Sequence, residues 1–286
     1  MKVYKQHKRI KMCILFVNVD PNPEKGAYRL VLATNRDEYY RRPSLPLHVD
    51  RNNIIGGKDM EPGREGGTWL AFRTKDQCNG KVKKHCIGVI LNVTGTIIEN
   101  PKSRGRIIVD YLLSNKSFPE YSEMLEKSFY NGYNFVSIEL SEENSMIYHH
   151  GNIPNVNSSY VGKHNLGFGN SPIFSPLTKV TKGRRMFEEI LKKNLSKEDL
   201  QAELFKLLKD ETRHLPDDEL QKRQPLAYEI LSAIFYKLDP PGYGTRTHTI
   251  ILIDYDWNLS VIEDTMCEPI DKNNPQWKRT SLNFKL

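Results

Sequence analysis

The chain has 286 residues and a formal net charge of +7, with 38% hydrophobic and 27% charged residues. This hydrophobic content excludes a disordered chain, and no run of about 18 apolar residues is present that could form a membrane-spanning helix. Five of the basic residues lie within the first eleven positions, so the rest of the chain is nearly neutral. This distribution disfavours a nucleic-acid-binding surface.

Residues 1–11 form a basic leader that we expect to be disordered, followed by one domain over residues 12–286. The leader lacks the apolar core of a secretory signal, and a degenerate mitochondrial leader is the alternative interpretation. The four cysteines form no C-x-x-C pair, which, without a secretory signal, indicates a reducing compartment.

In the first half of the chain, short apolar runs predict strands that are separated by polar turns. Strands are expected over residues 13–19 and 28–34, a charged loop over 35–43, and strands over 68–73 and 86–93 around a hairpin tip at 76–84. A helix is expected from residue 103 to 112, because apolar residues recur there at helical spacing, and a second helix over 119–129.

Strands return over residues 133–140, 145–149 and 164–168, and helices then dominate from 186 to 208 and from 225 to 238. Ser196 is placed to cap one of these helices, with Asp199 three positions on. Two further strands, over 247–254 and 259–263, complete the pattern. This grouped order of strands and helices predicts an α+β fold rather than a regular βαβ alternation.

Cys13 follows Met12 at the head of the first strand and is a candidate nucleophile. If translation started at Met12 and that residue were removed, the free α-amine of Cys13 would act as general base for its own thiol, as in N-terminal nucleophile hydrolases. The alternative is an inert buried cysteine at the start of a strand.

A second cluster is the polar run Asn35, Arg36, Asp37 and Glu38 at the end of a strand. These side chains have the chemistry to orient a nucleophile, bind an anion or cap the next segment. A solvated loop is the alternative explanation of such a run.

The third cluster is residues 241–248 (PGYGTRTH), which lead into the apolar strand 249–253. Its glycines permit close approach of a ligand, and Arg246 is suited to bind a carboxylate or phosphate. A glycine turn with Arg246 paired to an internal carboxylate is the alternative.

The eight histidines show no metal-ligand spacing, and no glycine-rich phosphate loop is present. We therefore expect no bound metal and no required cofactor. A haem held weakly by one His, Cys or Tyr remains compatible with the sequence.

Six motifs occur in order along residues 12–286: MCILF at 12, LVLATNRDEYY at 30, GGTWL at 66, SRGR at 103, YNGYNF at 130 and GYGTRTHTI at 242. Together they resemble the transport and Golgi organisation protein 2 family, also called the NRDE family. The resemblance implies a four-layer αββα sandwich similar to that of N-terminal nucleophile hydrolases.

The resemblance also implies a role in haem mobilisation and trafficking from organelles, and in lipid and acyl-CoA homeostasis, in the cytoplasm with Golgi or mitochondrial association. The function expected is therefore an intracellular haem carrier or chaperone, with haem as cargo. The alternatives are an N-terminal-cysteine thiol hydrolase acting on an amide or acyl thioester, and an acyl-CoA-binding protein.

By similarity to the more distant choloylglycine-type hydrolases, the catalytic set would be Cys13, Asp37, Asn92, Asn170 and Arg246, with Cys13 and Arg246 facing one cleft. For a carrier, the expected ligand-binding residues are Asn35, Arg36, Asp37, Glu38, Tyr243 and Arg246. Two departures disfavour hydrolysis: the leader places Cys13 inside the chain, and Thr34 stands where those hydrolases have an arginine.

Overall fold

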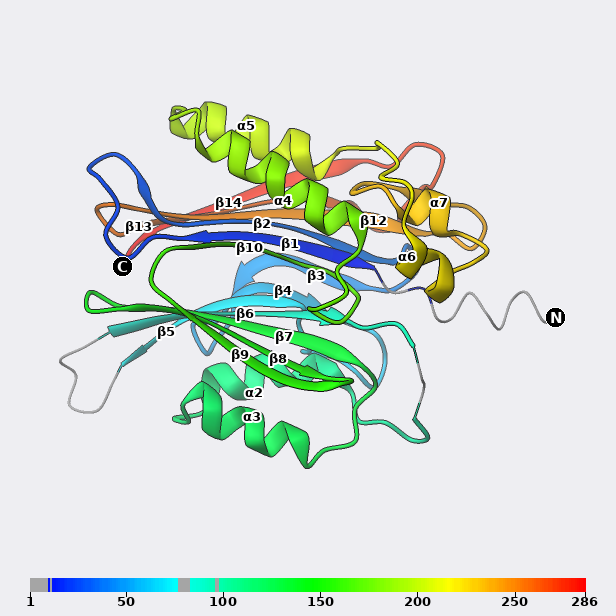
Figure 1. Cartoon of the computed structure of the whole chain (residues 1–286), viewed down its shortest axis with the longest axis horizontal. Coiled ribbons are helices and arrows are strands. Elements are labelled where there is room, and N and C mark those ends of the chain that lie inside the picture. Colours follow the sequence, from blue (N-terminus) through cyan, green and yellow to red (C-terminus); the bar gives the residue numbers. More distant parts are fainter. Residues whose placement is uncertain (1–9, 11, 77–82, 96–97) are drawn as a thin grey trace.

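The computed structural model describes residues 10, 12–76, 83–95 and 98–286, which form two antiparallel sheets with helices (Figure 1). The strands of the first sheet are β1 (Cys13–Val19), β2 (Tyr28–Tyr39), β10 (His164–Phe168), β11 (Lys237–Leu238), β12 (Tyr243–Asp254), β13 (Asn258–Met266) and β14 (Trp277–Lys285). Their order is β10-β1-β2-β12-β13-β14, and β11 pairs with β12. Strands from both ends of the chain therefore lie at the centre of one sheet.

The second sheet runs in simple chain order, β3-β4-β5-β6-β7-β8-β9. Its strands are β3 (Ser44–Val49), β4 (Ile55–Asp59), β5 (Leu70–Asp76), β6 (Lys83–Asn92), β7 (Tyr133–Leu140), β8 (Ser145–Asn152) and β9 (Asn155–Val161). The helices are the 3₁₀ turn η1 (Arg104–Arg106), α2 (Ile107–Leu113), α3 (Phe118–Glu126), α4 (Thr178–Leu191), α5 (Lys197–Leu208), α6 (Asp218–Arg223) and α7 (Tyr228–Leu231).

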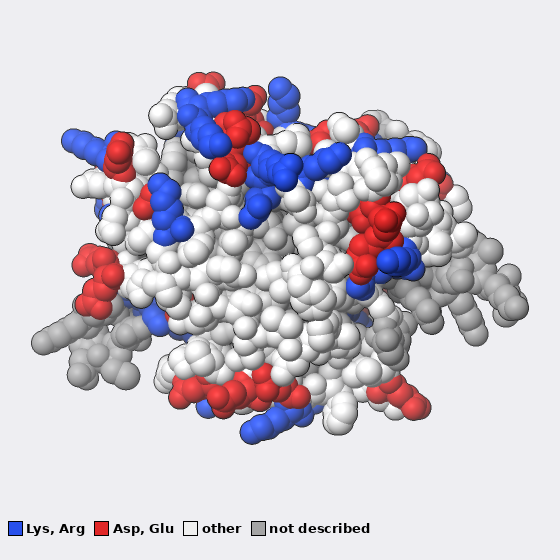
Figure 2. All heavy atoms as spheres, in the orientation of Figure 1, with Lys and Arg blue, Asp and Glu red and all other residues white. Residues whose placement is uncertain are grey.

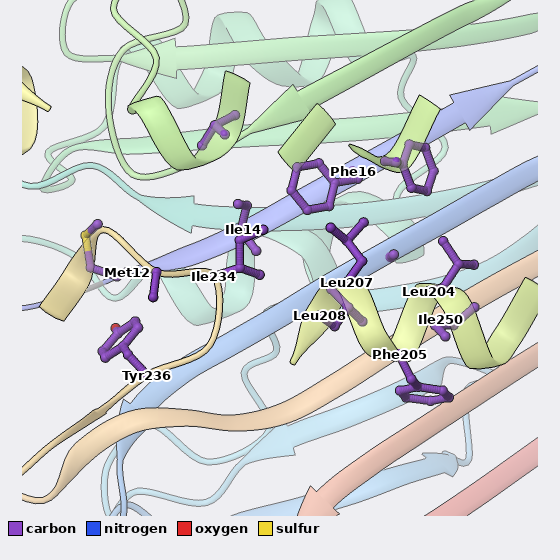
Figure 3. Packing of buried hydrophobic residues seen from close by; sticks show 14 of the residues in the cluster. Met12, Ile14, Phe16, Leu204, Phe205, Leu207, Leu208, Ile234, Tyr236 and Ile250 are labelled. Atoms are coloured by element: carbon purple, nitrogen blue, oxygen red, sulfur yellow. The ribbon is translucent and has the colours of Figure 1, made fainter. Parts of the chain in front are cut away.

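The two sheets pack face to face, with α4 and α5 outside the first sheet and α2 and α3 outside the second (Figure 1). Three apolar clusters fill the spaces between these four layers. Figure 3 shows the cluster under α5, where Phe16 of β1 and Leu204 of the helix contribute side chains. This arrangement confirms the expected mixed α and β class with antiparallel sheets.

Strand β1 shows how burial on both faces shapes the sequence. Met12, Ile14 and Phe16 belong to the cluster beneath the helices, whereas Cys13 and Leu15 belong to the cluster between the sheets. A strand covered on both sides is a continuous apolar run rather than an alternating one. The same pattern holds for residues 250–253 of β12.

The charged segment expected as a loop over 35–43 belongs largely to strand β2, which continues to Tyr39. Asn35 pairs with His248 of β12, and Arg36 pairs with Cys13 of β1. Backbone pairing on both sides thus overrides the polar character of this run, and its residues 35–37 are buried. The solvated-loop interpretation is wrong for this segment.

The helix expected over residues 225–238 is also wrong. Only the four-residue α7 forms, and the chain then continues in an extended path to β11. The Phe235 N–H donates to the Asp210 carbonyl and the Tyr236 carbonyl accepts the Thr245 N–H, so tertiary hydrogen bonds replace helical ones here. In contrast, Ser196 caps α5 as expected, accepting the Asp199 N–H at 3.1 Å.

Most of the expected leader, residues 1–9 and 11, lies outside the described residues, as does the hairpin tip at 77–82. Ile10 is described, and its buried side chain belongs to the same cluster as Met12. Across the described residues, no helix is both long and apolar enough to cross a membrane. On the face drawn in Figure 2, basic and acidic side chains lie side by side over α4 and α5. One ion pair of this part of the chain joins Lys193, just after α4, to Glu203 of α5 at 2.7 Å.

Candidate functional site

Cys13 begins β1 and directs its thiol into the space between the sheets. The Sγ atom accepts the Asp37 N–H at 3.4 Å from the neighbouring strand. Burial, with a further contribution from the nearby Asp37 carboxylate, raises the pKa of Cys13 to about 12. At neutral pH this group is therefore a thiol rather than a reactive thiolate.

The backbone N–H of Cys13 donates a short hydrogen bond to the side-chain oxygen of Asn170. The side-chain nitrogen of Asn170 in turn donates to the Asn92 carbonyl at 2.6 Å. Asn170 follows β10 and Asn92 ends β6, so one fully buried amide joins both sheets to the start of β1. The structure thus brings together Cys13, Asn92 and Asn170, three of the five residues carried over from the hydrolases.

The residue before Cys13 is also fixed. The Met12 N–H donates to the Tyr243 hydroxyl at 2.8 Å, and that hydroxyl donates to the Asp37 carbonyl at 3.1 Å. Met12 and Ile10 are buried in the apolar cluster, where Met12 lies near Tyr236 (Figure 3). In this chain the nitrogen of Cys13 is therefore a peptide amide inside a packed segment.

The Asp37 carboxylate lies on the other face of the sheet, toward the helices, beside Thr245, Tyr236 and Lys179. Neither oxygen of this carboxylate has a hydrogen-bond partner of normal geometry among the described residues. Burial raises the pKa of Asp37 to about 6, and the Lys179 ammonium and the two hydroxyl groups offset only part of this effect. Lys179 donates instead to the Ala233 carbonyl at 3.1 Å.

A pocket of about 80 Å³, here called the Cys13 pocket, opens beside the thiol. Its walls come from β1 and β2, the turn before β5, and the segment that leads into α2. The lining residues are Cys13, Arg36, Asp37, Glu38, Arg42, Asp59, Arg64, Thr68, Trp69, Ile90, Asn92, Ser103, Arg104 and Gly105. Several motifs that carry the family resemblance, at 30, 66 and 103, thus meet at one place.

The close approach of two glycines assembles this wall. A Cβ atom on Gly67 would lie 3.0 Å from the Cα of Gly105, and the Thr68 N–H donates to the Gly105 carbonyl at 2.9 Å. Arg64 and Arg104 are thereby brought to the same side of the pocket, and Arg104 is anchored by a hydrogen bond to the Gly132 carbonyl.

Three residues expected at the ligand site do not line the pocket. The Asn35 side chain donates to the carbonyls of Leu208 and Ile234 at 2.8 and 3.0 Å, which ties β2 to the segments around α5 and α7. Tyr243 is buried on the helix side of the sheet, where it holds Met12.

Arg246 is the third of these residues, and its side chain is fully buried. It lies at a bulge of β12, donates to the carbonyls of Tyr39 and Arg42 at 3.1 and 2.6 Å, and pairs with Glu268. Arg246 does not line the Cys13 pocket, although it lies close enough to Arg36 for their repulsion to lower the pKa of Arg36. Its own contacts support the structural alternative for this residue. Its guanidinium satisfies backbone carbonyls at the point where the chain leaves β2.

Sequence reasoning missed the other arginines of the pocket and Trp69. Arg64, Trp69 and Arg104 lie in or next to the motifs at 66 and 103, so those motifs could have indicated these pocket residues. What could not be inferred was that two turns separated by some 40 residues meet through Gly67 and Gly105.

Among the residues that the structure describes, no group of three His, Cys, Asp or Glu side chains is arranged to hold a metal ion. Cys13, Cys86 and Cys267 are free thiols, and Cys78 falls outside the described residues.

Comparison with known proteins agrees with the arrangement of motifs. The family model described as Transport and Golgi organisation 2 matches residues 12–268. A Transport and Golgi organization protein 2 from Drosophila melanogaster is 36% identical over 287 residues, covering 95% of this chain and 97% of the relative. A homologue of that protein from Homo sapiens is 32% identical over 289 residues, covering 96% and 99%. The chain therefore belongs to the transport and Golgi organisation 2 family.

Proposed function

We propose that this protein is a non-catalytic carrier that binds haem at the Cys13 pocket. The observation that carries this proposal is the state of Cys13, which combines a buried thiol of pKa about 12 with an amide nitrogen already bonded to Asn170. An N-terminal nucleophile needs a free α-amine beside an ionisable thiol, and this chain offers neither. A pocket without an activated nucleophile is suited to hold a ligand rather than to cleave it.

The choice of haem rests on the family resemblance, and the pocket supplies compatible chemistry. Haem carries two propionates, and one of them matches the guanidinium groups of Arg36 and Arg104 together. A volume of about 80 Å³ accepts a propionate but not a porphyrin, so the ring would lie across the pocket mouth. Such shallow binding suits a carrier, which must release its cargo.

The family relatives are named for transport and Golgi organisation. We extend that role to this chain, as transport of haem through the cytoplasm between organelles, with Golgi or mitochondrial association and a contribution to lipid homeostasis. The order of layers also supports descent from an N-terminal nucleophile hydrolase whose cleft now binds without cleaving.

A thiol hydrolase is the second candidate function, and one observation favours it. The side-chain oxygen of Asn170 accepts the N–H of Cys13. The Asp37 carboxylate has no hydrogen-bond partner of normal geometry among the described residues, and it is close enough to the Cys13 thiol to raise the pKa of that thiol. An α-ammonium at Cys13, created by removal of residues 1–12, would supply the missing donor.

Absorbance titration of the purified protein with haem tests the carrier. We expect saturable micromolar binding, unchanged in Cys13→Ala, and much weaker binding of haem dimethyl ester, which lacks free carboxylates. The first residue of the mature chain is determined on the same sample by mass spectrometry. The hydrolase would become the preferred function if the mature chain begins at Cys13 and Cys13→Ala abolishes cellular activity while haem affinity stays unchanged.

A further inference from the structure

We infer that the Cys13 pocket is a site for a single oxyanion group, a carboxylate or a phosphate, held by Arg36 and Arg104 with Arg64 at its rim. This inference deepens the proposed function, on which it rests for the identity of the whole ligand. It concerns the chemical group that enters the pocket, whichever larger molecule carries that group.

Arg36 provides the first argument. Its guanidinium lies 3.8 Å from the centre of the Trp69 ring, and only 5% of the residue is exposed. The Nη1 atom has no hydrogen-bond partner among the described residues. Glu38, Asp59 and Glu263 act on the charge of Arg36 from a distance, but none of them forms an ion pair with it. A buried guanidinium without a direct ion-pair partner among these acids is suited to meet an anion that arrives with the ligand. Stacking on Trp69 holds the guanidinium in one plane, which favours bidentate bonding.

The charges around Arg36 provide the second argument. Of the acids that line the pocket, Asp59 bonds Arg42 at 2.6 and 3.0 Å, and Glu38 lies 3.6 Å from the same arginine. The third, Asp37, directs its carboxylate to the opposite face of the sheet. Arg42 thus engages the two acids on this side.

The remaining guanidinium groups, Arg36, Arg64 and Arg104, form no ion pair with any described residue. Arg104 and Arg64 are close enough that their repulsion adds to burial in lowering the pKa of Arg104 to about 10. An anion placed between these groups would relieve that repulsion.

The size of the pocket selects the kind of anion. About 80 Å³ accommodates one carboxylate or phosphate group, and it excludes a ring or an acyl chain. Both haem propionates and the phosphates of acyl-CoA present this chemistry, so the same pocket serves either ligand.

The test uses inorganic phosphate and propionate as separate probes of the full-length protein. Binding is followed by the NMR signal of the Trp69 indole N–H, with Trp257 and Trp277, which do not line the pocket, as internal references. We expect both probes to shift the Trp69 signal and the reference signals to stay in place. Arg36→Met and Arg104→Met should each raise the dissociation constant about ten- to a hundredfold.

Arg106→Met is the matched control, because Arg106 is exposed and lies two residues from Arg104. Among the described residues it forms an ion pair with Asp110 at 2.8 Å. It should leave the dissociation constant unchanged. If Arg36→Met does not fold, Arg64→Met takes its place in the test, because Arg64 is exposed and its replacement should not disturb the fold. Arg64→Met should raise the dissociation constant of the probes at least threefold.

An unshifted Trp69 signal, or equal weakening by Arg64→Met and Arg106→Met, would overturn the inference. If haem binds, neither probe shifts the Trp69 signal and Arg36→Met keeps the haem affinity of the parent, the carrier proposal would be retained and the oxyanion site would be ruled out. Binding of the probes without binding of haem would keep the site and remove the haem carrier. A response to phosphate but not propionate would assign the site to a phosphate-bearing ligand such as acyl-CoA.

Discussion

Two hollows lie at opposite ends of strand β1 and on opposite faces of the first sheet. The Cys13 pocket measures about 80 Å³, whereas a hollow beneath the α4–α5 connection measures about 860 Å³. The larger one, here called the helix-side hollow, is lined by residues such as Asn18, His164, Asn165 and Leu200. Size alone would select it as the ligand site.

The charges of the two hollows lead to the opposite choice. In the helix-side hollow, Lys163 pairs with Asp20 at 2.7 Å and Lys192 pairs with Glu188 at 3.4 Å. In the Cys13 pocket, the Nη1 atom of the buried Arg36 has no hydrogen-bond partner within the described ranges of the chain. An anion-binding site is expected where buried cationic groups have no ion-pair partner. In a surface hollow whose lysines are already paired with acids, those lysines have less need of a bound anion.

The largest difference in folding stability is expected between two asparagine variants, one beside the Cys13 pocket and one in the helix-side hollow. Asn170→Ala would leave the buried Cys13 N–H without its acceptor and the partly buried Asn92 carbonyl without a donor. We expect a loss of about 2–4 kcal/mol in the free energy of unfolding, measured by urea denaturation. Asn165→Ala, in the helix-side hollow, should cost less than about 0.5 kcal/mol, because the side-chain oxygen of Asn165 has no hydrogen-bond partner in the part of the chain that the structure describes. Equal losses in the two variants would contradict the account of Asn170 as the link between the sheets.

A smaller effect is expected from Asp37→Asn, and it depends on pH. The pKa of Asp37 is about 6 when folded and about 3.8 when unfolded, so the folded protein binds this proton more tightly. The parent therefore loses stability from this group as pH rises from about 4 to 6. Asn cannot ionise, so the stability of the variant relative to the parent should increase over that interval, by on the order of 2 kcal/mol. Denaturation at pH 4, 5, 6 and 7 measures it, and a difference that does not change with pH would mean that Asp37 is not buried as described.

The smallest effect should come from Lys163→Met in the helix-side hollow. Its partner Asp20 is partly buried, but the Lys163 side chain is 72% exposed. Exposed ion pairs contribute about 0–1 kcal/mol, so the melting temperature should change little and haem affinity should not change. A clear loss of haem affinity in this variant would move the ligand site to the helix-side hollow.

The sequence alone was sufficient to predict the central strands, because the runs at 13–19 and 247–254 are long and apolar. The short second-sheet strands β3, β4 and β9 escaped prediction, since they carry glycine, proline or exposed polar residues and gain their pairing only from neighbours. Strand β14 escaped for a similar reason: it is an edge strand with an exposed, polar face.

For the candidate site, the motifs identified Cys13, Arg36 and Glu38, which do line the pocket. The similarity to choloylglycine-type hydrolases identified Asn92 and Asn170, which lie beside the Cys13 amide. They could not separate residues that face the pocket from residues that hold the strands together. Arg246 and Asn35 lie within the same motifs, yet their side chains satisfy buried backbone carbonyls. Adjacent residues of a strand face opposite sides, and the bulge at Arg246 changes that alternation in a way that sequence spacing does not reveal.

The most direct test of the central claim is the dissociation constant of haem for the parent protein, for Arg36→Met and for His164→Ala. Arg36 lies in the Cys13 pocket and His164 lines the helix-side hollow, where its imidazole would be the iron ligand if haem bound there. The account predicts that Arg36→Met weakens haem binding about tenfold or more, whereas His164→Ala leaves it within twofold of the parent. Weakening by His164→Ala with no effect of Arg36→Met would contradict it.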